Sequence, residues 1–183
     1  SNITEKIIGE FYDVYIDTMK RNKANSVFYY PFDVFVNLIH ENPDKVIICN
    51  IYDNKFIKCI STELNLISED SVYSFLGGTL EYEFQKRPND FLKYKLINWM
   101  RYHNKNFYIL GGGLSNNDGI FKFKKSFFPN DVVPFYTGRK VINDEVYSYL
   151  TNMYYRKRKE KGCDEDLSNE NNYFPLYRKP LKN

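Results

Sequence analysis

The sequence predicts an α+β fold, in which a mixed, mainly antiparallel sheet carries helices on both faces. Three observations predict it: apolar residues recur at helical spacing near the N-terminus, a β-hairpin pattern follows, and later strands alternate with helices. A helix between two strands permits parallel pairing, whereas the hairpin requires antiparallel pairing. With 183 residues, the chain is long enough to bury a substantial core.

The first half of the chain contributes two helices and three strands. Residues Ile3–Arg21 carry apolar side chains at helical spacing, and a second helix is predicted to begin near Pro31, whose fixed φ suits a first turn. Lys45–Tyr52 and Phe56–Ile67 are predicted to form a hairpin around a short Asp-Asn turn. A third strand is predicted over Ser71–Leu76, ending at two glycines.

The second half alternates helices and strands. A helix is predicted from Pro88 to about Asn104, and a strand that begins after Asn106 ends in three glycines. A short lysine-bearing helix and a final strand over Val132–Tyr136 follow. The last helix is predicted over Asp144–Lys159, and its apolar residues are expected to be buried: Val146, Leu150 and Met153.

Composition and charge limit the functional classes. The chain has 26 basic and 23 acidic side chains, and a net charge of +3 does not by itself indicate a nucleic-acid-binding protein. An aromatic fraction of 18% indicates aromatic-rich packing. No apolar run approaches the ~18 residues of a membrane span. We expect a cytoplasmic protein with one domain over residues 1–161 and a polar, Asn-rich tail over residues 162–183.

The residues that bind metals most often are few. The three cysteines form no CxxC pair, so we expect free thiols in a reducing compartment. His40 and His103 lie far apart without ligand spacing, and no metal site is predicted.

The segment Asn106–Arg139 is the most informative stretch of the chain. An apolar, aromatic run ends at Gly111, Gly112 and Gly113, where a ligand can approach the backbone because glycine has no Cβ. Lys124 follows in an alternation of phenylalanine and lysine. The segment therefore predicts a strand end that opens into a ligand-binding loop; the alternative is a tight turn followed by a helix with a solvated lysine face.

The order of these motifs resembles the GNAT acyltransferase superfamily, and more closely the C-terminal half-domain of the Fem-type peptidoglycan-bridge aminoacyltransferases. The resemblance covers most of Ile3 to Leu150. The motifs that carry it are Tyr15-x-x-Thr18-Met19-x-Arg21, Leu76-Gly77-Gly78-Thr79, Arg87-Pro88-Asn89, Leu110-Gly111-Gly112-Gly113, Gly119-x-Phe121-x-Phe123-Lys124-x-x-Phe127 and Pro134-Phe135-Tyr136-x-Gly138-Arg139.

The resemblance implies transfer of an activated acyl or aminoacyl group onto an amine, in the synthesis of a cell-wall or surface-glycan precursor. In that reading Lys124 is catalytic, because its ammonium stabilises the oxyanion of the tetrahedral intermediate. The residues implied to bind donor and acceptor are Phe123, Gly77, Gly78, Gly111, Gly112, Tyr15, Thr18, Arg21 and Arg87. For the residues of the first helix, the alternative is an ordinary helix surface.

One departure from the superfamily pattern bears on the donor. Acetyl-CoA-binding members place a glycine-rich loop before the central helix, where backbone amides hold a pyrophosphate. Here the stretch is Gln85–Asp90, in which Pro88 removes an amide donor and Asp90 adds negative charge. We therefore expect no permanently bound cofactor, and prefer aminoacyl-tRNA to acyl-CoA as the donor.

The partners that follow from this reading are an amine-bearing acceptor, tRNA and a second GNAT-like half-domain. The basic run Arg156–Lys159 with Lys161 is a candidate contact for tRNA phosphates, although cations also complement the dipole at a helix end. Two alternatives stay open: an acetyl-CoA-dependent N-acetyltransferase, and a non-catalytic half-domain that binds a partner domain or a substrate.

Overall fold

The structure is a computed structural model that describes residues 3–55, 57–113, 117–163 and 173–181. Internal contacts divide the chain into two compact units, Ser1–Asp131 and Val132–Asn183. The first unit holds the sheet and four α-helices, and the second holds one α-helix and a C-terminal segment. The predicted boundary between residues 161 and 162 lies inside the second unit.

Two helices open the first unit, as predicted. Helix α1 spans Glu5–Arg21, and the Thr4 hydroxyl caps it by accepting from the Ile7 amide at 3.4 Å. The 3₁₀-helix η1 (Ser26–Phe28) follows, and α2 spans Phe32–Glu41 directly after Pro31. Five residues of α1 form its buried stripe: Ile8, Phe11, Val14, Tyr15 and Thr18.

The sheet has four strands in the order β1-β2-β3-β4. Strands β1 (Val46–Tyr52), β2 (Cys59–Ile67) and β3 (Ser71–Thr79) pair antiparallel, whereas β4 (Phe107–Ile109) pairs parallel with β3. This confirms a mixed, mainly antiparallel sheet. The second hairpin arm, predicted from residue 56, begins at residue 59, and residue 56 lies outside the described residues.

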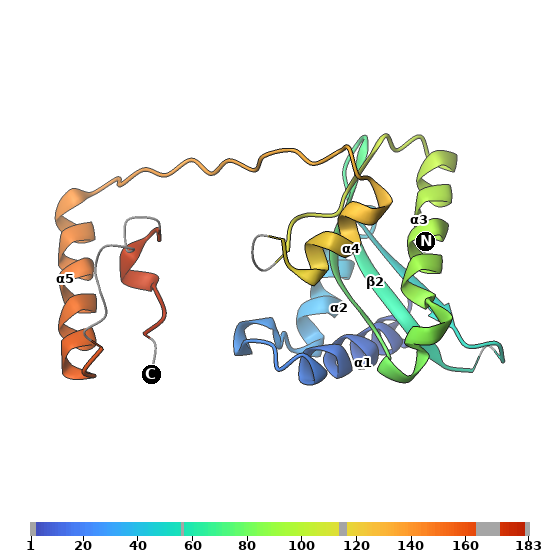
Figure 1. Cartoon of the computed structure of the whole chain (residues 1–183), viewed down its shortest axis with the longest axis horizontal. Helices are drawn as coiled ribbons and strands as arrows, with labels where there is room; N and C mark the ends of the chain where they lie inside the picture. Colours follow the sequence, from blue (N-terminus) through green and yellow to red (C-terminus); the bar gives the residue numbers. More distant parts are fainter. Residues whose placement is uncertain (1–2, 56, 114–116, 164–172, 182–183) are drawn as a thin grey trace. The chain divides into compact units, whose positions relative to one another are not determined.

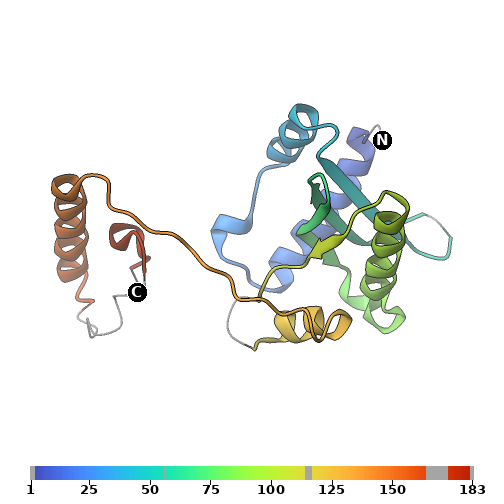
Figure 2. The ribbon, with the colours of Figure 1, turned by 90° about the horizontal axis from the view of Figure 1, so that it is seen from above.

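Helices cover both faces of this sheet (Figure 1). On one face, Leu64 of β2 packs in an apolar cluster with residues of α1 and α2. On the other face, the adjacent Glu63 contacts Lys93 of α3, which spans Pro88–Tyr102. Because successive strand residues point to opposite faces, α1 and α3 lie on opposite sides of the sheet. Figure 2 shows the same layers from above.

The remaining elements of the first unit connect these layers. A 3₁₀-helix, η2 (Glu81–Lys86), leads from β3 into α3, and α3 is the crossover that parallel pairing of β3 and β4 requires. Helix α4 spans Gly119–Phe127 and is capped by Asp118, whose carboxylate accepts from the Phe121 amide at 2.7 Å.

Two of the predicted strand assignments are wrong. No strand forms over Val132–Tyr136, where Phe135 is 90% exposed and no described segment pairs with the backbone. Its β-branched and aromatic composition indicated a strand, but prolines at 129 and 134 withhold amide donors and a strand needs a partner. The third strand does not end at Leu76 but continues through the glycines to Thr79.

The second unit is built around α5 (Asp144–Glu160), with the short 3₁₀-helix η4 (Leu176–Arg178) after it. The helix is confirmed, but Val146 and Met153, which were predicted to be buried, are 51% and 38% exposed, and Leu150 is half-buried. Tyr154 is its buried residue instead. Residues 164–172 and 182–183 of the predicted polar tail lie outside the described residues.

None of the helices in the described part of the chain combines the length and the apolarity that a membrane span requires. A group of three or more metal-binding side chains is likewise absent from the described residues.

Candidate functional site

The candidate site lies where β3 and β4 separate. The two strands pair in parallel from Ser71 opposite Phe107 to Tyr73 opposite Ile109. Strand β4 then ends, whereas β3 continues to Thr79 in pairing with β2. The chain that leaves β4 at Leu110 is therefore no longer bonded to β3 in the ladder. Such a separation of parallel strands leaves backbone groups available to a ligand or to side chains.

Lys124 of α4 reaches this strand end. Its Nζ donates a hydrogen bond to the Gly112 carbonyl at 2.8 Å and lies 3.8 Å from the position of a Cβ on Gly111. Gly111 has a φ of +68°, a conformation that glycine adopts without strain. The structure thus brings together three of the residues singled out in the sequence: Lys124, Gly111 and Gly112.

A buried polar cluster lies on the α3 face of the sheet and includes Tyr108, four residues before Gly112. Lys93 is 3% and Glu63 5% exposed. The Lys93 ammonium contacts Glu63 Oε2 and donates to Tyr108 OH at 3.0 Å and to Ser74 Oγ at 3.3 Å. Tyr108 OH donates to Glu63 Oε1 at 2.5 Å. Each of the three ammonium donors has a partner, which is what makes a buried lysine tolerable.

The cluster of Glu63, Lys93 and Tyr108 was not predicted from the sequence, although a signal for it exists. Lys93 directly follows Leu92 and precedes Leu96 by three positions, so it falls beside the apolar stripe of α3. Glu63 interrupts an otherwise uncharged strand. A lysine and a glutamate at two core positions indicate a buried pair only once α3 is known to pack against β2, which is a tertiary fact.

The charges around Lys124 alter its acidity. Burial lowers the pKa of Lys124, the positive charge of Lys93 lowers it further, and the carboxylates of Glu63 and Asp118 raise it in part. Burial and the Glu63 carboxylate raise the pKa of Tyr108 well above its usual range, so this hydroxyl stays protonated and can donate. The site therefore combines one half-buried amine of altered acidity with a closed network of charged and hydroxyl groups.

Gly77 and Gly78 lie side by side in β3 but face different sides of the sheet. Gly77 pairs with Glu63 and so lies on the α3 face, next to the polar cluster. Gly78 faces α1, where an added Cβ would lie 2.3 Å from Thr18 Oγ1 and 2.8 Å from the Val14 carbonyl. The absence of a side chain at Gly78 is therefore what lets α1 pack closely against β3.

The face of α1 that the sequence placed in a substrate cleft bonds to the protein itself. Thr18 Oγ1 accepts from the Thr79 amide at 3.2 Å, and Arg21 donates to the Thr79 carbonyl at 2.8 Å. Tyr15 is fully buried and its hydroxyl donates to the Phe28 carbonyl; burial raises the pKa of Tyr15 to about 12. These three side chains tie α1 to β3 and to η1, and none of these contacts involves Lys124.

The N-terminus of α3 is occupied by its own side chains. Arg87 adopts a left-handed conformation with φ of 52° and pairs with Asp90, while Pro88 is buried at the first helical position. Lys86 pairs with Glu83 at 2.6 Å. Phe123, the neighbour of Lys124 on α4, is half-buried and packs edge-to-face against Phe127 with ring centroids 5.2 Å apart.

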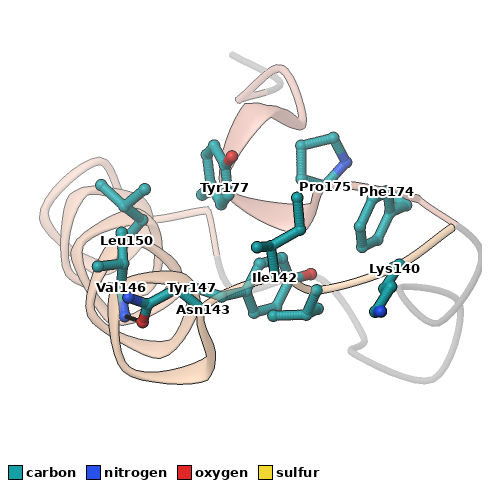
Figure 3. Close-up of a pocket in the computed structure, with 10 residues that line it drawn as sticks. Lys140, Ile142, Asn143, Val146, Tyr147, Leu150, Phe174, Pro175 and Tyr177 are labelled. Atoms are coloured by element: carbon teal, nitrogen blue, oxygen red, sulfur yellow. Dashed lines mark hydrogen bonds between the residues drawn. The ribbon is translucent and has the colours of Figure 1, made fainter.

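The second unit contains a pocket of about 250 Å³, shown in Figure 3. It lies between α5 and the C-terminal segment, where the Tyr147 ring stacks on Phe174 at 5.9 Å and the Leu176 amide donates to Tyr147 OH at 3.3 Å. Its walls are mainly apolar, and among the described lining residues only Lys140 carries a formal charge. We interpret this pocket as a consequence of the packing of the C-terminal segment on α5 and not as a catalytic site.

No protein-family model matches the chain, and neither does any curated protein.

Proposed function

We propose that the chain transfers an activated acyl or aminoacyl group onto an amine, and that Lys124 is the catalytic residue. The observation that carries this proposal is the placement of the Lys124 ammonium on the Gly112 carbonyl, where the parallel strands β3 and β4 separate. An ammonium held at an open strand end can stabilise negative charge on a carbonyl oxygen that comes to lie there.

The chemistry requires few groups. The acceptor amine attacks the carbonyl carbon of an ester or thioester, a C–N bond forms and the C–O or C–S bond breaks. The proton lost by the attacking amine balances the proton taken up by the leaving oxygen or sulfur. Lys124 donates a hydrogen bond to the oxyanion between these events, and a single such donor contributes about 10²- to 10³-fold in rate. Gly111 and Gly112 leave room for the substrate backbone.

Aminoacyl-tRNA is the donor that we favour over acyl-CoA. At the N-terminus of α3, Pro88 offers no amide and the Asp90 carboxylate already pairs with Arg87. A pyrophosphate would meet that carboxylate where a CoA-binding loop needs free amides. Exposed basic residues at the end of α5 are available for tRNA phosphates: Arg156, Lys157, Lys159 and Lys161. The acceptor that we propose is an amine of a cytoplasmic cell-wall or surface-glycan precursor.

Transfer assays on a matched pair of variants test the role of Lys124. Lys124→Met should abolish transfer from a radiolabelled aminoacyl-tRNA mixture to amine acceptors, with an unchanged far-UV spectrum. Lys122→Met changes an exposed lysine of the same helix and should leave the rate unaltered. Equal rates for the wild type and Lys124→Met would remove Lys124 from the mechanism.

Titration calorimetry with acetyl-CoA tests the choice of donor. We expect no saturable heat with the wild-type chain. Micromolar binding, together with acetylation of an amine, would instead establish the N-acetyltransferase alternative.

A second candidate function, a non-catalytic half-domain, is favoured by the apolar surface near β4. Tyr73, Phe107 and Ile109 are 41%, 58% and 39% exposed, and the strand pairing places them on one face at the edge of the sheet. Exposed apolar groups of this kind occur at sites of protein association. This candidate requires that the wild-type chain transfers nothing from either donor class, so measurable transfer by the chain alone excludes it.

A further inference from the structure

Lys93 joins four elements of the first unit. From α3 its ammonium contacts Glu63 on β2, Ser74 on β3 and Tyr108 on β4. Stability alone does not require such a buried pair, because apolar residues of similar volume are often as stabilising in the same place. The position of the pair is therefore informative, because Lys93 contacts Ser74 directly after the last pair of β3 and β4, Tyr73 and Ile109.

Two features of the structure connect this cluster to Lys124. Tyr108 is bonded to both members of the pair and stands four residues before Gly112, whose carbonyl Lys124 binds. Among the charges that act on Lys124, that of Lys93 has the largest effect. The charges of Glu63 on β2 and Asp118, the cap of α4, act in the opposite direction.

We propose that Lys93 is a positioning residue for acyl transfer: anchored by Glu63, Ser74 and Tyr108, it fixes the strand end that binds Lys124 and supplies a second positive charge beside it. This inference rests on the proposed function. Lys93 itself is buried and need not touch the substrate. Its charge adds to the field at the oxyanion, while Glu63 keeps the pair neutral overall and the buried charge tolerable.

Competitive labelling of lysines tests this inference without any knowledge of the substrate. The folded chain is treated with trace acetic anhydride across a pH series, and the acetylation of each lysine is read by mass spectrometry. Only the neutral amine reacts, so the labelling profile reports the pKa of Lys124 directly. Lys122 and Lys125 are exposed on the same helix and serve as internal controls, whose labelling should not differ between variants.

Lys93→Met removes the repulsive charge, so the pKa of Lys124 should rise and its labelling at pH 8 should fall about threefold or more. Lys93→Arg keeps the charge and should restore most of the labelling. A purely structural role for Lys93 would not make labelling follow the charge at position 93. The inference is overturned if the Lys124 profile is the same in the wild type and in Lys93→Met.

Two further measurements keep the test decisive. If Lys93→Met does not fold, the double variant Glu63→Gln/Lys93→Met removes both charges. Labelling of Lys124 should again decrease in this variant, but by less, because the effect of the Lys93 charge on Lys124 exceeds that of Glu63. A failure of the proposed function appears differently, as absence of transfer in a wild type whose Lys124 labelling still depends on position 93. In that case the electrostatic contact between Lys93 and Lys124 stands, and its assignment to acyl transfer is overturned.

Discussion

The two faces of the sheet differ in what they bury. On the α1 face the core is apolar and aromatic, with Phe35 of α2 meeting Phe11 and Tyr15 of α1 edge-to-face at 5.1 and 5.5 Å. On the α3 face the charged pair of Lys93 and Glu63 is buried as well, and the hydroxyl of the half-buried Tyr108 donates to Glu63. The α1 face buries mainly apolar and aromatic side chains, whereas the α3 face buries a charged pair.

This difference separates residues that hold the fold from residues suited to chemistry. Four polar or small residues of the sequence motifs belong to the α1 face, where they bond or pack between α1 and β3: Tyr15, Thr18, Arg21 and Gly78. Lys124, Gly112 and Gly77 belong to the neighbourhood of the α3-face cluster. The predictions below test whether the two faces behave as differently as their chemistry implies.

Truncating the aromatic core should have the largest effect on stability. Phe35 is 1% exposed, and Phe35→Ala should lower the free energy of unfolding by about 3–5 kcal/mol. Val34 is the matched control: it is 42% exposed, and Val34→Ala should change stability by at most about 0.5 kcal/mol. Urea unfolding followed by the fluorescence of Trp99, the single tryptophan, measures both.

Breaking the charged pair of the α3 face should cost a similar amount, but in a non-additive way. Lys93→Met leaves the Glu63 carboxylate buried without its counter-ion, which costs about 3–5 kcal/mol. Glu63→Gln/Lys93→Met leaves no charge unpaired and should recover much of that loss. A double variant as unstable as the sum of both single variants would show that the two residues act independently.

Substitutions at Gly78 and Gly112 should have smaller effects on stability, and these effects should differ between the two positions. Gly78→Ala places a methyl group against the Thr18 hydroxyl and the Val14 carbonyl, and overpacking of this kind costs about 1–3 kcal/mol. Gly112→Ala meets no atom within 4 Å and should leave the unfolding curve unchanged. We expect Gly112→Ala to slow transfer instead, since the added methyl occupies space proposed for the substrate. Destabilisation by Gly112→Ala would argue against an open strand end.

The smallest expected effect is on the pH dependence of transfer, in which the pH at which the rate declines should change. A lysine of lowered pKa carries its charge below that pKa and loses it as the pH rises through it. If the ammonium of Lys124 is the active form, transfer is fastest at lower pH and declines at a pH below that expected of an exposed lysine. Lys93→Met should move the decline to higher pH. A rate that increases with pH through this range would identify the neutral amine as the active form.

Local sequence patterns were sufficient for most of the elements. The amphipathic spacing of α1, the proline before α2 and the hairpin pattern each specify structure through neighbours in the chain. Both helices and the antiparallel hairpin formed, although the second hairpin arm begins at residue 59 rather than 56. Strand Val132–Tyr136 failed because strand propensity is realised only with a pairing partner. The burial of Val146 and Met153 failed for a related reason, since helical spacing does not say what a helix packs against.

The candidate site likewise contains some residues that local sequence patterns indicate and others that only the tertiary structure brings together. The glycines after β4 could be singled out from the sequence, because glycine lets a ligand approach the backbone, whereas Lys124 was singled out through the resemblance to a family motif. The cluster of Glu63, Lys93 and Tyr108 was not predicted from the sequence, because these residues lie at three separate places in the chain and meet only across the sheet.

The sequence by itself thus determined most of the helices and strands, and it singled out the glycines after β4. The tertiary structure decided which residues share a face. It placed Gly78 and the polar residues of α1 in helix–strand packing, and it joined Lys93 to Glu63 and Tyr108 across the sheet. The physical reason is that helical spacing, caps and turns depend on residues a few positions apart in the sequence. Electrostatic coupling and close packing depend instead on distances in space, which only folding creates.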